Sequence, residues 1–534
     1  MTDSFDYIVL GAGSAGAALA SRLSADPSNR VLLLEAGGRD RNLWLQIPIG
    51  VGKVMSSDKY SWNLSTQPEP HFNGRRIMWN HGKVIGGSSG INGMLVVRGE
   101  PKRYDEWARQ SSPGWSHDEL LPYLMRLEDC PFGDPAVRGR GGPVSIHRLE
   151  TDDPLSKAFI KACEGLGLPY NEDYNDGTCE GVSRNQLNTR AGRRWGTANA
   201  YLKPALKRPN LELQCNALVK RVVIENGRAT GVEYEQDGRS LVANAHSEVI
   251  LSCGALHSSQ VLEHSGVGDS ERLRSVGITP VHHLPGVGEN LRDHLHARLQ
   301  FEGNQTATAN DLLNKPWFAI KEAVRYALFR EGLFRTPSLK TTGFVRSPHA
   351  SEFPDVRVQL GLSSGVSREA KDGIDRFSGF NLGCYDLYPT AAGSVHVMSP
   401  DPRQPPHMYA NYLGTERDLA INLWALKFVR TIAAQSALRD VTVREVRPGL
   451  EVHNDDELIE YIRNTAQTSW HPVGSCKMGS DPMAVVDADL RVHGLSGLRV
   501  ADASVMPFHV SSNTNIPSIA VGEKAADLVL GNRR

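Results

Sequence analysis

A glycine-rich segment near the start of the chain has the spacing of a dinucleotide-binding loop. The pattern G-x-G-x-x-G runs through Gly11, Gly13 and Gly16, between an apolar stretch at 5–10 and an Ala- and Leu-rich stretch at 14–23. These flanks predict a buried strand and a helix. The first glycine permits a tight turn, the second lets the backbone approach a pyrophosphate, and the third lets helix and strand pack closely. The segment predicts a dinucleotide site, without choosing between FAD and NAD.

Glu35 is an acidic residue at the position that completes this motif. It ends a second apolar stretch, 31–34, nineteen residues after Gly16. That stretch predicts a second buried strand, so the segment reads as a βαβ unit. A carboxylate at the end of this strand can accept hydrogen bonds from ribose hydroxyls. The glycine motif therefore has the structural context that a dinucleotide site requires.

A second glycine-rich segment spans residues 82–93, where exposed backbone amides could pack closely against a ligand. Gly86, Ser88 and Gly90 also match the G-x-S-x-G nucleophile elbow, which makes a serine hydrolase an alternative. That elbow needs a helix directly after the serine, whereas residues 94–99 read as extended. The hydrolase interpretation is therefore disfavoured.

Histidines are a further source of chemistry, because imidazole can act as a base near neutral pH. The chain has 18 of them, and His282, His283, His294 and His296 form a cluster. No carboxylate or cysteine completes a metal-ligand set there at a familiar spacing. The sequence therefore predicts no metal site.

Length and composition indicate a large globular chain around these motifs. A chain of 534 residues is longer than a domain with a single hydrophobic core usually is, so two or three domains are expected. Lys and Arg total 59 against 60 for Asp and Glu, which gives no electrostatic reason to expect nucleic acid. Seven scattered cysteines, no signal-type start and no apolar run of 18 residues predict a cytoplasmic protein without a transmembrane segment.

Alternating and apolar patterns predict the elements that must position the motifs. Strands are expected at 211–215, 219–224, 231–236, 248–252, 356–361 and 394–398, and helices at 102–109, 117–128, 258–264, 317–329 and 419–435. No repeat or low-complexity linker separates them, which favours a chain that crosses between its domains more than once.

Several long motifs in order give the chain a resemblance to the glucose–methanol–choline (GMC) flavoprotein oxidoreductases. The segment 82–92 resembles the first signature of that family and 254–268 the second, and the segments 285–294, 470–479 and 499–507 also match. The resemblance runs from residue 5 to about 530 and is weakest between 300 and 450. It implies FAD rather than NAD, and an α/β fold with a Rossmann-like FAD-binding domain and a substrate-binding domain of antiparallel sheet plus helices.

The resemblance also implies domain boundaries and the mode of FAD attachment. The FAD-binding domain is expected at 1–155, 210–300 and 462–534, and the substrate-binding domain at 156–209 and 301–461. Some members attach FAD covalently through a histidine before the asparagine of the first signature, where this chain has Ile91. Non-covalent FAD is therefore expected. The sequence at residues 389–393 differs from the one that relatives often carry there. This difference puts the local turn of the substrate-binding domain in doubt, but not the chemistry.

The motifs and the resemblance together assign a set of cofactor contacts. Residues 92–95 are expected at the isoalloxazine, Val219 at the adenine side, and Asp502 near the ribityl and pyrophosphate. The full set of expected cofactor-binding residues is Gly11, Gly13, Ser14, Ala15, Gly16, Glu35, Ala36, Gly82, Val84, Gly87, Ser88, Asn92, Gly93, Met94, Leu95, Val219, Cys253, Gly254, Asp502, Ala503, Asn515 and Ile516.

Two catalytic positions follow from the resemblance. His471 lies in the segment that matches the family's catalytic histidine, and we expect it to take the substrate's hydroxyl proton. The second position, histidine or asparagine, comes forty-odd residues later and is assigned to Asn515, with Asn513 as its rival. Ser518 favours Asn515, because it matches the hydroxyl residue that follows the catalytic one in relatives. Trp470 is expected to form a wall of the substrate pocket.

The predicted activity is oxidation of a primary alcohol to an aldehyde, with proton abstraction by His471 and hydride transfer to flavin N5. A polyol, sugar or choline-type dehydrogenase of the same family is an alternative, and an FAD-containing hydroxynitrile-type lyase is one of another class. The electron acceptor is left open between oxygen and a quinone- or dye-like carrier.

Overall fold

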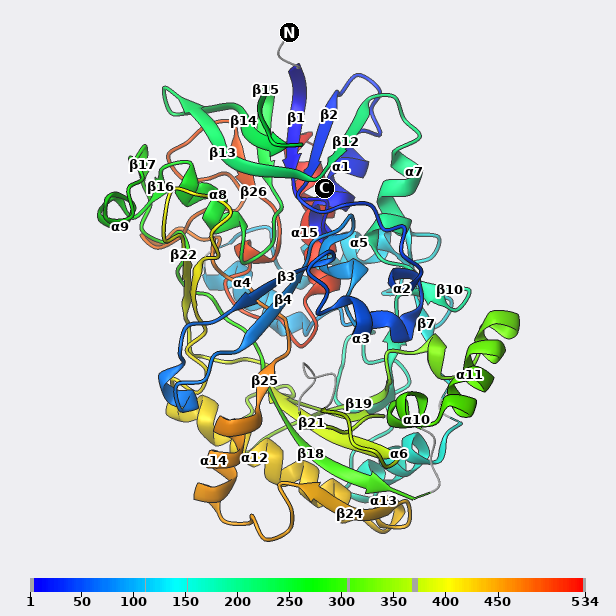
Figure 1. Cartoon of the computed structure of the whole chain (residues 1–534). Helices are drawn as coiled ribbons and strands as arrows, with labels where there is room; N and C mark the ends of the chain where they lie inside the picture. Colours follow the sequence, from blue (N-terminus) through cyan, green and yellow to red (C-terminus); the bar gives the residue numbers. More distant parts are fainter. Residues whose placement is uncertain (1–3, 111, 151, 305–307, 367–372, 532–534) are drawn as a thin grey trace.

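Two sheets organise the computed structural model, which describes residues 4–110, 112–150, 152–304, 308–366 and 373–531. The first sheet lies in the upper part of Figure 1 and the second in the lower part. Each sheet has its own large cluster of buried apolar side chains. The architecture is the α/β fold expected from the sequence, with two layered halves whose chain segments alternate.

The first sheet is mainly parallel. It consists of β12 (Leu211–Cys215), β2 (Val31–Glu35), β1 (Ser4–Leu10), β15 (Arg239–Leu251), β14 (Arg228–Gln236) and β13 (Ala217–Glu225) in that order, with β26 (Leu498–Val500) also paired to β15. The strands β12, β2, β1, β15 and β26 run parallel, whereas β13 and β14 form an antiparallel extension. β2 is buried throughout, as expected for a parallel strand covered on both faces.

Helices at both chain ends pack together beside this sheet. The helices of this half are α1 (Ser14–Leu23), α4 (Pro101–Gln110), α5 (His117–Leu127), α7 (Lys203–Ala205), α8 (Ser258–His264), α9 (Ser270–Ser275) and α15 (Asn515–Val529). A Cβ at Gly522 would lie 2.3 Å from the Ala15 carbonyl oxygen, so this glycine lets α15 pack directly against α1. The N-termini of α1 and α15 also lie close together, since Ser14 at the start of α1 bonds Asn515 at the start of α15 at 2.8 Å.

The second sheet is antiparallel. It consists of β24 (Thr442–Arg447), β18 (Leu295–Gly303), β21 (Gly379–Asp386), β20 (Val356–Gly361), β19 (Leu339–Val345) and β8 (Gly181–Arg184) in that order, with β25 (Gln467–Thr468) paired to β18. Its helices are α6 (Pro154–Gly165), α10 (Ala309–Asn314), α11 (Pro316–Phe329), α12 (Glu416–Ala433), α13 (Ser436–Arg439) and α14 (Asp455–Thr465). α12 and α6 pack on the sheet from below in Figure 1, which leaves the opposite face toward the first half.

Short elements connect these parts. They are α2 (Leu43–Gln46), η1 (Pro48–Gly50), α3 (Val51–Val54), β3 (Ser61–Ser65), η2 (Pro70–Phe72), β4 (Met78–Gly82), η3 (Gly87–Gly90), β5 (Glu128–Asp129), β6 (Val144–Ser145), β7 (His147–Arg148), β9 (Gln186–Leu187), β10 (Thr189–Arg190), β11 (Arg193–Arg194), η4 (Ala198–Leu202), β16 (Val267–Gly268), β17 (His282–His283), η5 (Leu333–Arg335), β22 (Ser394–His396), β23 (His407–Tyr409) and η6 (Ala503–Val505).

Two stretches bear on the expected domain boundaries. The boundary placed at residue 300 falls within β18, and all of β18 pairs inside the second sheet. Residues 198–205, assigned to the substrate-binding domain, bury Tyr201 and Leu202 in the apolar cluster of the first sheet. The chain thus passes from one half of the structure to the other at positions that neither a change in composition nor a linker marks.

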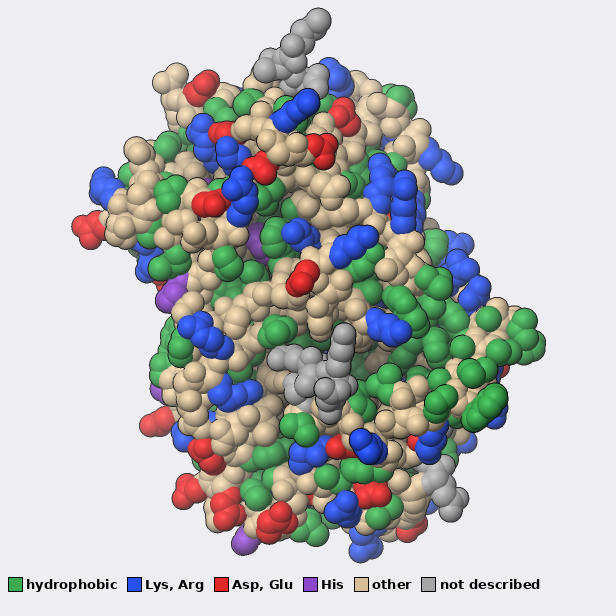
Figure 2. Space-filling view, in the orientation of Figure 1, with side chains coloured by type: hydrophobic (Ala, Val, Ile, Leu, Met, Phe, Trp, Pro, Cys, Tyr) green, Lys and Arg blue, Asp and Glu red, His purple; other side chains and the backbone are tan. Residues whose placement is uncertain are grey.

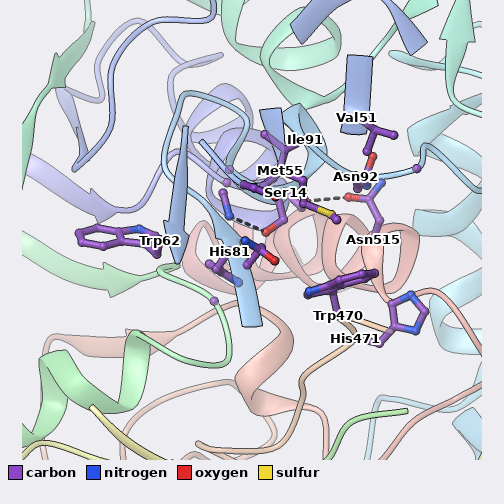
Figure 3. A pocket seen from close by; sticks show the side chains of 18 of the residues that line it. Ser14, Val51, Met55, Trp62, His81, Ile91, Asn92, Trp470, His471 and Asn515 are labelled. Atoms are coloured by element: carbon purple, nitrogen blue, oxygen red, sulfur yellow. Dashed lines mark hydrogen bonds between the residues drawn. The ribbon is translucent and has the colours of Figure 1, made fainter. Parts of the chain in front are cut away.

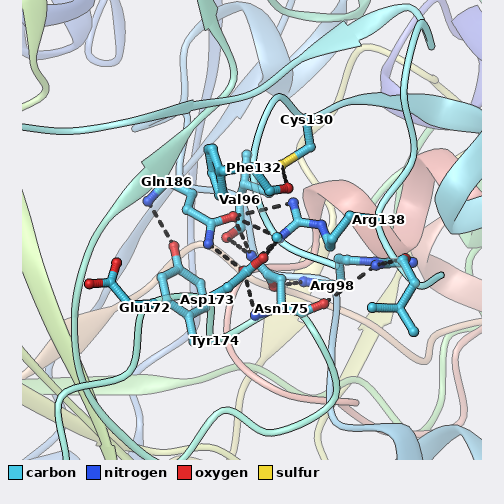
Figure 4. Close-up of polar contacts among 12 residues, drawn as sticks. Val96, Arg98, Cys130, Phe132, Arg138, Glu172, Asp173, Tyr174, Asn175 and Gln186 are labelled. Atoms are coloured by element: carbon cyan, nitrogen blue, oxygen red, sulfur yellow. Dashed lines mark hydrogen bonds and ion pairs between the residues drawn. The ribbon is translucent and has the colours of Figure 1, made fainter. Parts of the chain in front are cut away.

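A buried polar cluster holds the segment at 94–98 in place (Figure 4). Arg138 donates to Glu128 Oε1 at 2.8 Å and to Asp173 Oδ1 at 2.6 Å. Asn175 Nδ2 donates to the Val96 carbonyl at 3.1 Å, and Gln186 Nε2 to Asp173 Oδ1 at 2.7 Å. Because a buried guanidinium with two carboxylates would be costly to disrupt, this cluster fixes the backbone that borders the site.

The outer surface carries interspersed acidic and basic side chains, with hydrophobic side chains gathered over α11 (Figure 2). On that helix Trp317, Ile320, Val324 and Leu328 are all exposed. No helix within the described ranges is both long and apolar enough to span a bilayer. In the same ranges, no group of three or more His, Cys, Asp or Glu side chains is arranged to hold a metal ion.

Candidate functional site

A cavity of about 1540 Å³ lies between the two halves (Figure 3). It exceeds the roughly 300–1,000 Å³ typical of pockets for drug-sized ligands, and is large enough for a dinucleotide and a substrate together. The first half contributes both glycine segments, and the second half contributes the upper faces of β20 and β21. Ala319, Ile320 and Ala323 of α11 form an apolar part of its rim.

The three glycines of the first loop meet different surroundings. A Cβ at Gly11 would lie 2.5 Å from the Ser252 carbonyl oxygen, and one at Gly16 would lie 2.0 Å from that of Gly11. At Gly13 the nearest atoms would be 3.9 Å away, and this residue faces the cavity. Packing therefore requires glycine at the first and third positions, whereas the second leaves open space beside the backbone.

This contrast predicts different effects for two alanine substitutions. Gly13→Ala should leave the unfolding temperature of the flavin-free chain unchanged, because the protein has room for a Cβ and the φ of −80° suits alanine. It should weaken FAD retention at least about tenfold by blocking close approach of the pyrophosphate. Gly16→Ala should cost about 1–3 kcal/mol of unfolding free energy, as overpacking does.

Thermal unfolding of the flavin-free proteins and the flavin-to-protein absorbance ratio would measure the two effects. Gly16→Ala serves as the matched control, since it adds the same methyl group to the same loop. Undiminished FAD binding by Gly13→Ala would argue against this loop as the phosphate site.

Glu35 lies at the end of β2, next to the loop. Its Oε2 accepts a hydrogen bond from the Ala12 N–H at 3.0 Å and its Oε1 from the Gly37 N–H at 2.8 Å. Burial raises the pKa of Glu35 to about 7, against the lowering effect of these two bonds. The two backbone bonds leave further lone pairs on the carboxyl oxygens for ribose hydroxyls.

The second glycine segment contacts the first. A Cβ at Gly87 would lie 2.7 Å from the Gly13 Cα. Gly87–Gly90 forms the short 3-10 turn η3, and the Ser88 hydroxyl oxygen accepts a hydrogen bond from the Gly82 N–H at 3.1 Å. Between η3 and α4, in the described residues 91–100, no helix follows the serine. The arrangement lacks the strand–turn–helix context of a nucleophile elbow.

Most of the other expected cofactor residues also line the cavity. Asp502 Oδ2 accepts a hydrogen bond from the Gly254 N–H at 2.8 Å, which joins two of them. Of the full expected set, Gly16, Val84 and Ile516 do not line it. Ile91 lines the cavity at the position of the family's attachment histidine.

Two helix N-termini converge at the cavity. Ser14 begins α1 and Asn515 begins α15, and the Ser14 hydroxyl donates to Asn515 Oδ1 at 2.8 Å (Figure 3). Asn515 Nδ2 is buried and has no protein partner among the described residues. Helix N-termini attract negative charge and offer free N–H groups. The residues present therefore fit FAD, with open space at Gly13 and an unpartnered amide at Asn515 facing the same cavity.

His471 lies elsewhere in the cavity and pairs with Asn513. Its Nε2 is 2.9 Å from Asn513 Nδ2, and its Nδ1 is 3.0 Å from His294 Nδ1. The structure thus brings the rival asparagine to the histidine, and it places Asn515 against Ser14 instead. The spacing from His471 could not distinguish two asparagines only two residues apart, one before the N-cap Thr514 and one at the first residue of α15.

A chain of hydrogen bonds sets the tautomer of His471. His294 Nε2 is 2.9 Å from the Leu387 carbonyl, which can only accept, so this nitrogen carries the proton. Neutral His294 then accepts at Nδ1 from His471 Nδ1–H. His471 Nε2 is left with a lone pair, which accepts from the Asn513 amide. His471 therefore presents an unprotonated nitrogen to the cavity.

The electrostatic surroundings keep these imidazoles neutral. Burial, assisted by the His294 ring and the Arg357 guanidinium, lowers the pKa of His471 well below its usual 6.5. Burial also lowers the pKa of His294 to about 3. A neutral histidine whose Nε2 carries a lone pair rather than a proton can act as a proton acceptor, which is the state that alcohol oxidation requires.

Asp293 holds the turn that carries Trp470 and His471. Its Oδ1 accepts from the His471 N–H at 2.7 Å, and its Oδ2 accepts from the hydroxyls of Thr468 and Tyr412. Trp470 has a φ of +58°, a left-handed conformation that is rare for a bulky residue. This backbone turns the indole and the imidazole into the cavity together. Trp470 thus lines the cavity, and its role as a wall of the substrate pocket stays a prediction.

Several polar residues of the second sheet were not anticipated. Arg357 and Gln359 of β20, and Asn381 and Tyr385 of β21, all line the cavity. Arg357 Nε donates to the Thr342 hydroxyl at 2.8 Å, and Arg357 Nη1 donates to Asn513 Oδ1. A signal was present in the sequence, because Arg357 and Gln359 alternate with apolar residues within a predicted strand. Period-two alternation places both on one face.

Comparison with known proteins gives a consistent result. Two family models match the chain, and both are described as GMC oxidoreductase. The first matches residues 5–296 and the second matches residues 389–522. Oxygen-dependent choline dehydrogenase of Rhizobium rhizogenes is 40% identical over 537 residues, covering 99% of this chain and 96% of that protein.

Solved structures with the same fold include two oxidases. Pyridoxine 4-oxidase from Mesorbium loti has a TM-score of 0.89 and 31% identity, covering 98% of each chain. A variant of formate oxidase from Aspergillus oryzae RIB40 has a TM-score of 0.92 and 25% identity, covering 99% of this chain and 98% of that one. The likeness extends over both halves of the structure.

Proposed function

This chain belongs to the GMC oxidoreductase family and is an FAD-dependent oxidoreductase acting on CH–OH donors, and from that premise we propose that it oxidises a primary alcohol to an aldehyde with His471 as base and Asn513 as hydrogen-bond donor. The observation that carries the proposal is the 2.9 Å contact between His471 Nε2 and Asn513 Nδ2 inside the cavity of the glycine loops. Asn515 is reassigned to the cofactor side.

The proposed chemistry divides between cofactor and protein. FAD, held by the two glycine segments, Glu35 and the N-termini of α1 and α15, supplies the hydride acceptor when bound. The Nε2 lone pair of His471 accepts the hydroxyl proton once the substrate hydroxyl replaces the Asn513 amide as its hydrogen-bond donor. Asn513 Nδ2 has two N–H groups, so it can donate to the substrate oxygen and stabilise the developing alkoxide charge. Trp470 limits the space beside the reacting carbon.

Anaerobic mixing with a panel of primary alcohols tests this proposal. Loss of the flavin absorbance after mixing with an alcohol is the expected result. A hydroxynitrile-type lyase would retain a yellow flavin with every alcohol, and that outcome would overturn the proposal in favour of the lyase. Release of the flavin on acid precipitation would support non-covalent attachment, which Ile91 favours.

The proposal also extends to the substrate and the electron acceptor. A choline-type substrate is one alternative, which the name of the relative at 40% identity suggests, and a polyol or sugar is another of the same family. The names of the relatives include an oxygen-dependent dehydrogenase and oxidases, which supports oxygen as an acceptor, with a quinone- or dye-like carrier as the alternative. A cytoplasmic location stays a prediction of the sequence.

The pKa of His471 predicts the pH dependence of the reductive step. The base is active when neutral, and its pKa is lowered well below 6.5 by burial, His294 and Arg357. Protonation therefore requires a lower pH than for an ordinary histidine. The limiting rate of anaerobic flavin reduction should be flat above about pH 6.5 and fall only in more acidic solution. An acid limb centred at or above pH 6.5 would contradict this account.

A further inference from the structure

Within the described residues, the guanidinium of Arg357 has no carboxylate partner. Arg357 is fully buried and lines the cavity beside the proposed catalytic pair. Its guanidinium donates to the hydroxyls of Thr342 and Tyr385, at 2.8 Å and 3.1 Å, to the Ser512 hydroxyl and to the amide oxygen of Asn513. All of these partners are neutral, and no ion pair to Arg357 occurs within the described part of the chain.

Among the residues that the structure describes, no acidic side chain pairs with this guanidinium inside the cavity. Among the described lining residues the carboxylates are Glu35 and Asp502, and both lie on the cofactor side. Glu35 is bonded to the Ala12 and Gly37 amides and Asp502 to the Gly254 amide. The described residues around Arg357 are polar but uncharged, including Gln359, Asn381 and Tyr385.

The guanidinium also has hydrogen-bonding capacity to spare. Its Nη2 carries two protons, and within the described ranges its protein acceptor is Asn185 Oδ1, at the long distance of 3.4 Å. A buried cation with weakly used donors is costly unless an anion approaches it. Guanidinium donors match the two oxygens of a carboxylate.

We propose that Arg357 forms an anion-binding subsite that makes this enzyme select short alcohols bearing a carboxylate and reject alcohols bearing a fixed positive charge. The inference rests on the proposed function, because it places this subsite next to the base of that reaction. Arg357 and His471 bond opposite ends of the same Asn513 side chain. Only a few carbons therefore separate the hydroxyl from the carboxylate in the preferred substrate, as in a short ω-hydroxycarboxylate.

Charge-matched pairs of alcohols test the proposal on the wild-type enzyme. Choline is compared with its uncharged isostere 3,3-dimethylbutan-1-ol, and 4-hydroxybutanoate with 4-hydroxybutanamide. The measured quantity is the limiting rate of anaerobic flavin reduction divided by the apparent dissociation constant. This quantity should be at least about tenfold larger for 3,3-dimethylbutan-1-ol than for choline, and at least about tenfold larger for 4-hydroxybutanoate than for 4-hydroxybutanamide. The reason is that close charges in a buried site interact strongly. A preference for choline over its isostere would overturn the proposal.

Substitutions then assign the preference to Arg357. Arg357→Gln should bring both ratios close to one, whereas Arg357→Lys should keep their direction because it keeps the charge. Ratios are used because loss of the Asn513 contact lowers the rate with every alcohol. Arg346→Gln is the matched control: Arg346 lies just beyond β19 of the same sheet, is paired with Glu180 at 2.7 Å, and does not line the cavity. It should leave both ratios unchanged, and equal ratios in Arg357→Gln and wild type would refute the assignment.

Acetate binding provides a readout without turnover. Acetate should perturb the flavin absorbance of the wild type and of Arg346→Gln, and bind at least about tenfold more weakly to Arg357→Gln. Acetamide should show no such difference. This titration decides on the subsite even if no alcohol reduces the flavin, an outcome that would overturn the proposed function alone. If Arg357→Gln fails to retain FAD, Arg357→Lys and the wild-type ratios decide instead.

Discussion

Replacing His471 with alanine is expected to leave bound FAD in place and to lower the rate of flavin reduction by an alcohol about 10²–10⁴-fold, the usual contribution of a general base. The expected cofactor contacts come from the glycine segments and the N-termini of α1 and α15, where Asn515 bonds Ser14 rather than His471. His471 instead offers the unprotonated Nε2 that the hydroxyl proton needs. Anaerobic stopped-flow absorbance measures the rate, and the flavin-to-protein absorbance ratio measures retention.

His453→Ala is a suitable control, because His453 is exposed, lies in a loop before α14, and does not line the cavity. That variant should reduce its flavin at the wild-type rate. If His471→Ala also reduced its flavin normally, another group would have to accept the proton and the assignment of the base would be lost.

The second large effect concerns the two asparagines. Asn513→Ala should lower flavin reduction about 10²–10³-fold, as expected when one donor to a developing oxyanion is removed, and it should retain FAD. Asn515→Ala should change the reduction rate less and weaken FAD retention, because Asn515 bonds Ser14 at the start of α1.

Each asparagine variant serves as the control for the other, since both remove the same amide from the same turn. Rates from anaerobic mixing and FAD dissociation constants from titration of the flavin-free proteins would separate the two roles. A larger loss of reduction in Asn515→Ala than in Asn513→Ala would restore the assignment made from the sequence.

Local patterns predicted much of the fold. The apolar stretches at 5–10 and 31–34 are β1 and β2, and the helix expected between them is α1. The strand expected at 356–361 is β20. These predictions succeed because side-chain periodicity and glycine spacing depend on near neighbours in the chain. The expected strand at 248–252 is only the end of the longer β15, whose first four residues are exposed.

Residues brought together from distant segments were harder to predict. His294 was recognised as part of a family motif, but its hydrogen bond to His471 joins positions 177 residues apart. Arg357 reaches Asn513 across the boundary between the two halves. Such contacts depend on how the sheets face each other, and no pattern within either segment encodes that arrangement.

The sequence by itself therefore determined the cofactor, the reaction class and the identity of the candidate base. Gly11, Gly13, Gly16 and Glu35 are close enough in sequence for their spacing to specify the phosphate and ribose contacts, and family motifs identified His471. The tertiary structure decided which asparagine faces that base, which nitrogen of His471 carries the lone pair, and that the Arg357 guanidinium lies beside them. Those properties arise where the first and second sheets meet, because hydrogen-bond partners and burial are set by packing between segments rather than by order along the chain.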